Sequence, residues 1–180
     1  ASLAFHTRVG LDDVTVEGIR SITARDIREA HASGCEIKLL AIAQRRDDDH
    51  AHGISVRVHP ALVPADHPLA SVHGAFNAVL VEAESAGRLM FYGQGAGGAP
   101  TASAVLSDVV AAAAHRVHGG RAPRESCYAD LPILGPESAI TRYQIQLRVD
   151  DKPGSLAALA GAFAVNDVSI NSVRQNEYVG

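Results

Sequence analysis

Residues 91–101 read FYGQGAGGAPT, and this stretch organises the chain around it. It places Gly93, Gly95, Gly97 and Gly98 directly after an apolar run and directly before an Ala/Val-rich segment of helical length. Glycine lets the backbone turn sharply and approach a ligand closely, because it has no Cβ. The first N–H groups of a following helix have no intrahelical partner, so they favour an anion there. The stretch therefore predicts a strand-to-helix turn that is able to approach a bound molecule.

The glycine spacing satisfies the dinucleotide pattern G-x-G-x-x-G only formally. That fingerprint belongs to a β-α-β unit and is followed, after a second strand, by an acidic residue about 20 positions on. Here the preceding strand is expected to close an antiparallel hairpin, and no such acidic residue follows. A tight strand-to-helix turn without any ligand is therefore the alternative interpretation of residues 91–101.

Four runs of β-branched and aliphatic residues lie before the glycine-rich stretch, and their lengths and boundaries predict strands. They are residues 37–43, 54–59, 78–84 and 88–92. A polar, solvent-exposed loop is expected at 45–53, and Ser85-Ala-Gly87 predicts a short hairpin connection. Together these runs predict one mostly antiparallel sheet of about four strands.

Two helices are predicted beside this sheet. One spans 24–33, because Thr23-Ala-Arg-Asp26 has the pattern of a capping box and Gly34 is suited to end the helix. The other spans 100–118, with Pro100 at its first position and glycines after its end. The predicted fold class is α+β, with helices covering one face of the sheet.

Residues 119–141 are rich in proline and glycine and predict a linker between domain 1–118 and domain 142–180. The second domain alternates in hydropathy over 143–149, turns at 150–154, and then predicts a helix at 155–164 and a strand at 168–173. This is a β-α-β unit that needs further strands or a partner chain to cover its sheet.

The turn of this second unit, DKPGSL at 151–156, is the other segment able to carry chemistry. A Pro-Gly turn that leads into a helix offers backbone donors to a carboxylate, and Asp151 is able to take an ammonium group. Both features together fit an amino acid. An ordinary β-α turn with a helix cap is the alternative.

Composition excludes several classes of protein. Among 180 residues, 47% are hydrophobic and 20% are charged, which excludes a disordered or fibrous chain. The net charge of −4 argues against non-specific nucleic-acid binding. No apolar run is long enough for a membrane span, and the N-terminus does not resemble a secretory signal. We therefore expect a cytoplasmic protein in which Cys35 and Cys127 are reduced.

Metal and hydrolase sites find little support. His50 and His52 stand beside three aspartates, but we expect two histidines one residue apart at a flexible loop tip to point in opposite directions, which favours a solvated charge run over a metal site. Serine is absent from any G-x-S-x-G pattern, so a nucleophile elbow is not predicted.

Seven segments resemble, in order, the latter part of the substrate-binding and dimerisation domain of homoserine dehydrogenases. They are residues 3–5, 16–19, 37–41, 58–63, 67–70, 74–78 and 93–105. Residues 143–175 resemble the ACT domain appended to many bacterial members, through DDKPGSL at 150–156 and VSIN at 168–171. The second domain is thus expected to be a partial, ferredoxin-like ACT unit.

The resemblance implies NADP- or NAD-dependent interconversion of L-homoserine and L-aspartate 4-semialdehyde, in a dimer or larger homo-oligomer with threonine as effector. It also implies that the Rossmann domain and the catalytic lysine precede Ala1, because Lys38 matches a structural strand. No catalytic residue is then expected in this chain, and the chain alone is expected to be inactive. The alternative is a non-catalytic dimerisation and amino-acid-binding fragment.

Site residues follow from the same resemblance. Gly97 is expected to lie against the nicotinamide end of the cofactor, within a cofactor-binding set of Gly93, Gly95, Gly97 and Thr101. The expected effector-binding residues are Asp151, Gly154, Ser155 and Leu156.

Overall fold

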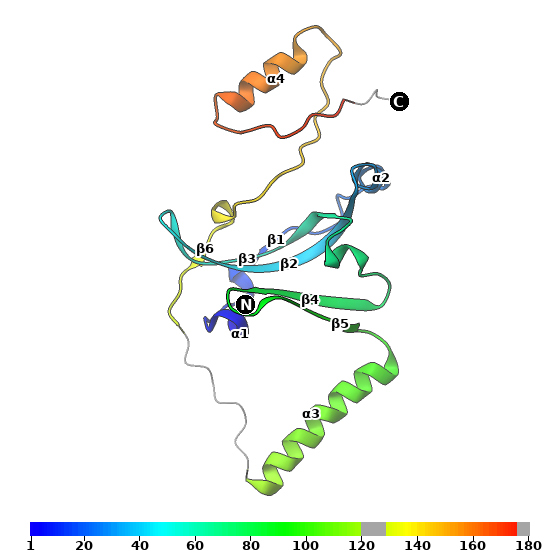
Figure 1. Ribbon diagram of the computed structural model, residues 1–180, viewed down its shortest axis with the longest axis vertical. Coiled ribbons are helices and arrows are strands. Elements are labelled where there is room, and N and C mark those ends of the chain that lie inside the picture. Colours follow the sequence, from blue (N-terminus) through cyan, green and yellow to red (C-terminus); the bar gives the residue numbers. More distant parts are fainter. Residues whose placement is uncertain (120–128, 176–180) are drawn as a thin grey trace. The chain divides into compact units, whose positions relative to one another are not determined.

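A computed structural model describes residues 1–119 and 129–175. The chain combines helices and strands and divides into two compact units, Ala1–Ile140 and Thr141–Gly180 (Figure 1). Within the described ranges, no helix has both the length and the hydropathy that crossing a bilayer requires.

Two long antiparallel strands form the centre of the first unit. β2 (Cys35–Asp48) and β3 (Ala51–Pro64) pair without interruption from Cys35 opposite Pro64 to Asp48 opposite Ala51. The predicted loop at 45–53 is therefore wrong, since only residues 49–50 form the turn. The charged residues of the predicted loop continue the strands instead. Asp47 and His52, for example, form a cross-strand pair with 2.8 Å between Oδ1 and Nδ1.

Short parallel strands occupy the other edge of β3. β1 (Thr15–Val16) pairs with it at Arg57 and Val58, and β6 (Ile133–Leu134) pairs with it at Ile54 and Ser55. The strand order is β1-β3-β2, with β6 also on β3 (Figure 1). Ile54 and Ser55 are almost fully buried, with 0% and 2% exposed, because β3 has partners on both edges there.

The other two predicted strands form a separate sheet. β4 (Phe76–Ala83) and β5 (Gly87–Gln94) pair antiparallel, and Gly87 closes their short turn at φ +68°. Phe76 and Tyr92 stack across this hairpin with ring centroids 4.8 Å apart. The prediction that these four strands form one sheet is wrong. The polypeptide between β3 and β4 bends through a 3-10 turn, Pro68–Ser71, and among the described residues β4 and β5 pair only with each other.

Capping signals predict the helices better than packing signals do. α2 (Ala24–Ala32) begins with the predicted capping box, in which the Asp26 N–H donates to Thr23 Oγ1 and the Thr23 N–H donates to Asp26 Oδ2. α1 (Ser2–Phe5) is a single turn. α3 (Gly98–His118) begins two residues before the predicted start, so Pro100 occupies its third position.

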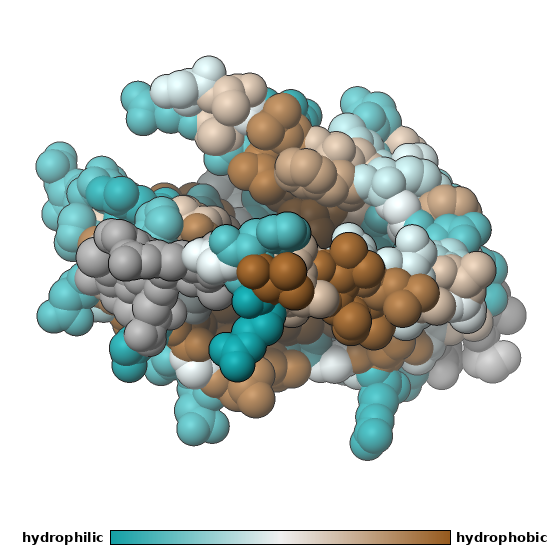
Figure 2. Space-filling view, turned by 90° about the horizontal axis from the view of Figure 1, so that it is seen from below, coloured by the Kyte–Doolittle hydropathy of each residue, from teal (hydrophilic) through white to brown (hydrophobic). Residues whose placement is uncertain are grey.

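α3 does not cover the sheet. None of its side chains is buried, and its apolar stripe is open to solvent, including Val105, Leu106, Val109, Val110 and Val117. Figure 2 views the molecule from the end at which α3 lies in Figure 1 and shows apolar atoms exposed there. The expectation that helices cover the sheet is thus wrong for α3.

The second unit contains α4 (Ser155–Ala164), at the predicted position. Residues 143–149 and 168–173 do not form the predicted strands in the described part of this unit. A strand exists only where its backbone finds a partner, and a split β-α-β unit leaves a gap between its two strands that another strand fills. The alternating hydropathy of these segments therefore does not produce paired strands here, and their apolar residues Tyr143, Ile145 and Ile170 are exposed.

Candidate functional site

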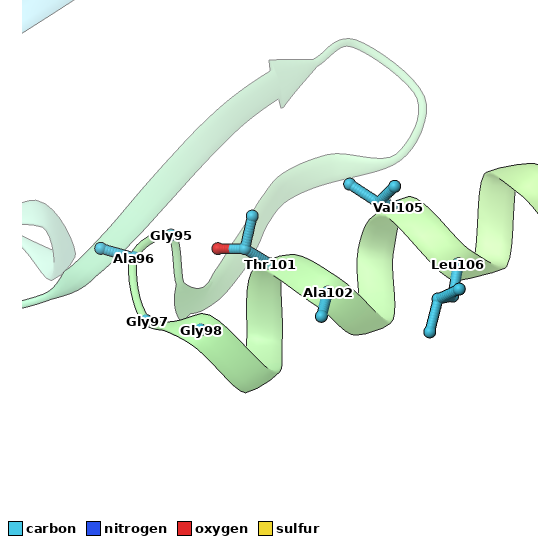
Figure 3. A pocket seen from close by; sticks show the side chains of 8 residues that line it. All are labelled: Gly95, Ala96, Gly97, Gly98, Thr101, Ala102, Val105 and Leu106. Atoms are coloured by element: carbon cyan, nitrogen blue, oxygen red, sulfur yellow. The ribbon is translucent and has the colours of Figure 1, made fainter.

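The glycine-rich stretch forms a turn between β5 and α3. β5 ends at Gln94, Gly97 caps α3, and the Thr101 N–H donates to the Gly97 carbonyl at 3.1 Å. An open pocket of about 890 Å³ lies along this turn and the start of α3 (Figure 3). Its lining residues are Gly95, Ala96, Gly97, Gly98, Thr101, Ala102, Val105 and Leu106.

Only two of the four glycines, Gly95 and Gly97, have a reason within the described residues to lack a side chain. Gly97 adopts φ +116°, a conformation that L residues rarely take. A Cβ on Gly95 would lie 1.8 Å from Nδ2 of Asn77 and 2.8 Å from its Cγ. Gly93 and Gly98 meet nothing within 4 Å of a Cβ. Only a molecule from outside the described residues would therefore require a glycine at Gly98.

Neutral groups line the pocket. Among them, the Gly98 N–H lies in the first turn of α3 and has no intrahelical partner. The Thr101 hydroxyl points toward the Gly95–Ala96 turn (Figure 3). Among the lining residues, apolar side chains and glycines supply the rest of the surface. The arrangement suits a ligand with an apolar body and a hydrogen-bond acceptor.

The three predicted cofactor residues of the turn and helix start, Gly95, Gly97 and Thr101, line this one pocket. Gly93 does not, since it lies within β5 opposite Asn77. Asn77, in segment 74–78, is not predicted as a site residue, because only the tertiary structure brings its amide against Gly95.

The second predicted site lies at the start of α4. Gly154 caps this helix at φ +95°, and a Cβ there would meet nothing within 4 Å. The Ser155 hydroxyl donates to the Asp150 carbonyl at 2.9 Å. Lys152 pairs with Asp150 at 2.8 Å, while Asp151 lies exposed in the bend and Leu156 is also exposed. The four predicted effector residues therefore lie on one short surface segment.

Polar side chains at the β2–β3 tip pair with one another. His52 and Arg45 hydrogen-bond to Asp47 and hold the pKa of that carboxyl below its usual value. Arg46 and the N–H groups of His50 and Ala51 do the same for the pKa of Asp48. Over the described ranges, no cluster of three or more His, Cys, Asp or Glu residues is arranged to hold a metal ion. Cys35 is a free thiol, and Cys127 lies outside the described residues.

Comparison with known proteins gives the glycine-rich turn its context. The family model described as homoserine dehydrogenase matches residues 1–110, which include the turn and most of α3. The chain belongs to the homoserine dehydrogenase family. The homoserine dehydrogenase of Mycobacterium tuberculosis is 59% identical over 180 residues, which are 99% of this chain and 41% of that protein. That of Corynebacterium glutamicum is 57% identical over 178 residues, covering 98% and 40%.

Solved homoserine dehydrogenases also share the fold. The crystal structure from Thiobacillus denitrificans matches 97% of this chain and 41% of its own, with a TM-score of 0.81 and 34% identity. A Staphylococcus aureus structure matches 62% of this chain and 27% of its own, with a TM-score of 0.54 and 36% identity. The chain thus spans about two fifths of the length of the family members that it matches most fully.

Proposed function

We propose that this chain is part of an NAD(P)-dependent homoserine dehydrogenase that interconverts L-homoserine and L-aspartate 4-semialdehyde in the cytoplasm. Family membership across nearly the whole chain supports the reaction, and the open pocket at the glycine-rich turn supports a binding role. Family membership is the observation that carries the proposal, and the open pocket at the glycine-rich turn is the place in this chain where we propose that the nicotinamide binds.

In this reaction a bound nicotinamide supplies a carbon that exchanges a hydride with the alcohol carbon of the substrate. The part of this chain is to bind and orient. The N–H group of Gly98 would hold the carboxamide oxygen, and the apolar side chains of Val105 and Leu106 would exclude water beside the ring. A proton-transferring lysine would come from outside these 180 residues, so we expect the chain alone to show no turnover.

Gly98→Ala is expected to raise the Michaelis constant for the cofactor at least tenfold in a full-length enzyme that carries this sequence. Among the described residues, no atom lies within 4 Å of a Cβ at this position, and Gly98 begins α3, where the helical backbone accepts alanine. Loss of cofactor affinity without loss of stability would therefore report a ligand close to this backbone. Steady-state kinetics with varied NADP and NAD, together with thermal unfolding, measure both quantities.

Gly97→Ala is the matched control, because it adds the same methyl group at φ +116°. We expect it to lower stability by about 1 kcal/mol or more whether or not a cofactor binds nearby. An unchanged cofactor constant in Gly98→Ala would show that the turn has no ligand against it.

A homo-oligomer is expected from the apolar surface that the chain leaves open. Leu39 and Leu62 are 51% and 39% exposed on one face of the β2–β3 pair, and α3 exposes its apolar stripe. A second copy of the chain is the proposed cover for the sheet face. Light scattering of the 18.8 kDa chain at micromolar concentration should give at least twice that mass. A stable monomer would contradict this proposal.

We also propose that the second unit is part of an ACT domain and that L-threonine regulates the enzyme there. Asp151 would take the ammonium group of the amino acid, and the Leu156 N–H in the first turn of α4 would take its carboxylate. The Ser155 N–H donates to the Lys152 carbonyl at 3.2 Å. The left-handed turn at Gly154 leaves the approach to the Leu156 N–H open, since no atom lies within 4 Å of a Cβ there.

A further inference from the structure

Residues 129–138, here called the strap, lie near the C-terminal end of the first unit and bond to three other parts of that unit. At the N-terminal end of the strap, the Ala129 N–H donates to the His6 carbonyl. The Thr7 hydroxyl donates to the Ala129 carbonyl at 3.1 Å, and Thr7 is only 3% exposed. A buried hydroxyl needs such a partner, so this bond holds the segment after α1 against the strap.

The middle of the strap is part of the sheet. The Ile54 N–H donates to the Pro132 carbonyl at 2.9 Å, and β6 continues the pairing along β3. The approach is close because Gly53 has no side chain, and a Cβ there would lie 2.4 Å from the Pro132 carbonyl oxygen. The strap therefore has little freedom to shift without moving the most deeply buried part of β3.

Arg46 holds the C-terminal end of the strap. Its guanidinium donates to the Ser138 carbonyl and also pairs with Asp48, and its side chain is only 11% exposed. The Ser138 hydroxyl donates to the Gly135 carbonyl at 2.6 Å, which closes a short 3-10 turn, Pro136–Ser138. The second unit begins at Thr141, just beyond this anchored turn.

We infer that the strap transmits the state of the second unit to the first, with Arg46 and Thr7 as the positioning residues at its two ends. A displacement of the chain at Thr141 reaches Ser138 first and acts on the Arg46 anchor. It then acts on β3 through β6, and on the segment after α1 through Ala129. The part of this inference that concerns inhibition rests on the proposed action of threonine at the second unit.

The test compares Arg46→Met and Thr7→Val with Arg45→Met in a full-length enzyme that carries this sequence. Arg45 is the matched control, because it lies beside Arg46 on β2 and pairs with Asp47 at 2.8 Å but has no bond to the strap. We expect both strap variants to shift the inhibitory concentration of L-threonine at least fivefold while uninhibited turnover stays within twofold. The control should superimpose on the parent.

Hydrogen exchange gives a second readout that needs no effector. Arg46→Met should lower the protection of the Ala129 amide, at the other end of the strap, whereas Arg45→Met should not. Unchanged protection at Ala129 would overturn the inference. Unchanged inhibition curves in both strap variants would overturn it as well. If threonine does not inhibit the parent enzyme, the proposed effector is wrong, and exchange at Ala129 alone decides whether the strap transmits.

Discussion

Gly53→Val is expected to lower the free energy of unfolding by about 3 kcal/mol, the size typical of a severe packing clash. Its Cβ would lie 2.4 Å from the carbonyl oxygen of Pro132 and 3.0 Å from the Leu134 side chain. The first of these atoms is backbone and has no alternative rotamer, so β6 must leave β3. The bond from Ile54 to Pro132 would be lost with it. The shift in the thermal midpoint measures the effect.

Gly18→Val is the control for the added side chain alone, since Gly53 also has φ +153°, which strains an L residue. A Cβ at Gly18 meets nothing within 4 Å, so valine there should alter stability by only about 0.5 kcal/mol. Equal effects at Gly18 and Gly53 would mean that the close approach of the strap to β3 contributes nothing to stability.

Gly154→Glu is expected to relieve inhibition by L-threonine at least tenfold while sparing uninhibited turnover. The new carboxylate would stand at the start of α4, where the carboxylate of the proposed effector would bind, and would repel it. Inhibition curves of the full-length enzyme with increasing threonine measure the change.

Backbone strain needs its own control at this position, because Gly154 has φ +95° and any L residue there is strained. Gly154→Ala carries the strain without the charge. Relief that is much larger in the glutamate variant than in the alanine variant assigns the effect to the effector carboxylate. Inhibition curves of Gly154→Glu that superimpose on those of the parent would remove this turn from the proposed regulation.

Local signals in the sequence determine much of the secondary structure. The capping box at Thr23 and Asp26 predicts the start of α2, and Ser85-Ala-Gly87 predicts the turn of the β4–β5 hairpin. The glycine-rich stretch predicts the passage from β5 to α3. Each of these features depends on groups only a few positions apart, which the sequence displays side by side.

The sequence alone does not show why an individual glycine is needed. The four glycines of 93–98 look equivalent in the sequence, but Gly97 needs its positive φ and Gly95 makes room for Asn77. Gly98 has neither constraint, which is why it gives the sharper test of a ligand. The identity of a ligand rests on family membership, because a neutral, open pocket does not specify one.

Tertiary structure alone decided the strand ends, the number of sheets and the strap. Arg46 appears in the sequence as part of a solvated charge run, yet its guanidinium reaches the Ser138 carbonyl, 92 positions away. Residues 143–149 alternate like a strand but find no backbone partner in the described part of their unit. Pairing and burial join groups that are distant along the chain, so local pattern marks which residues are able to pair, and only the fold determines which of them do.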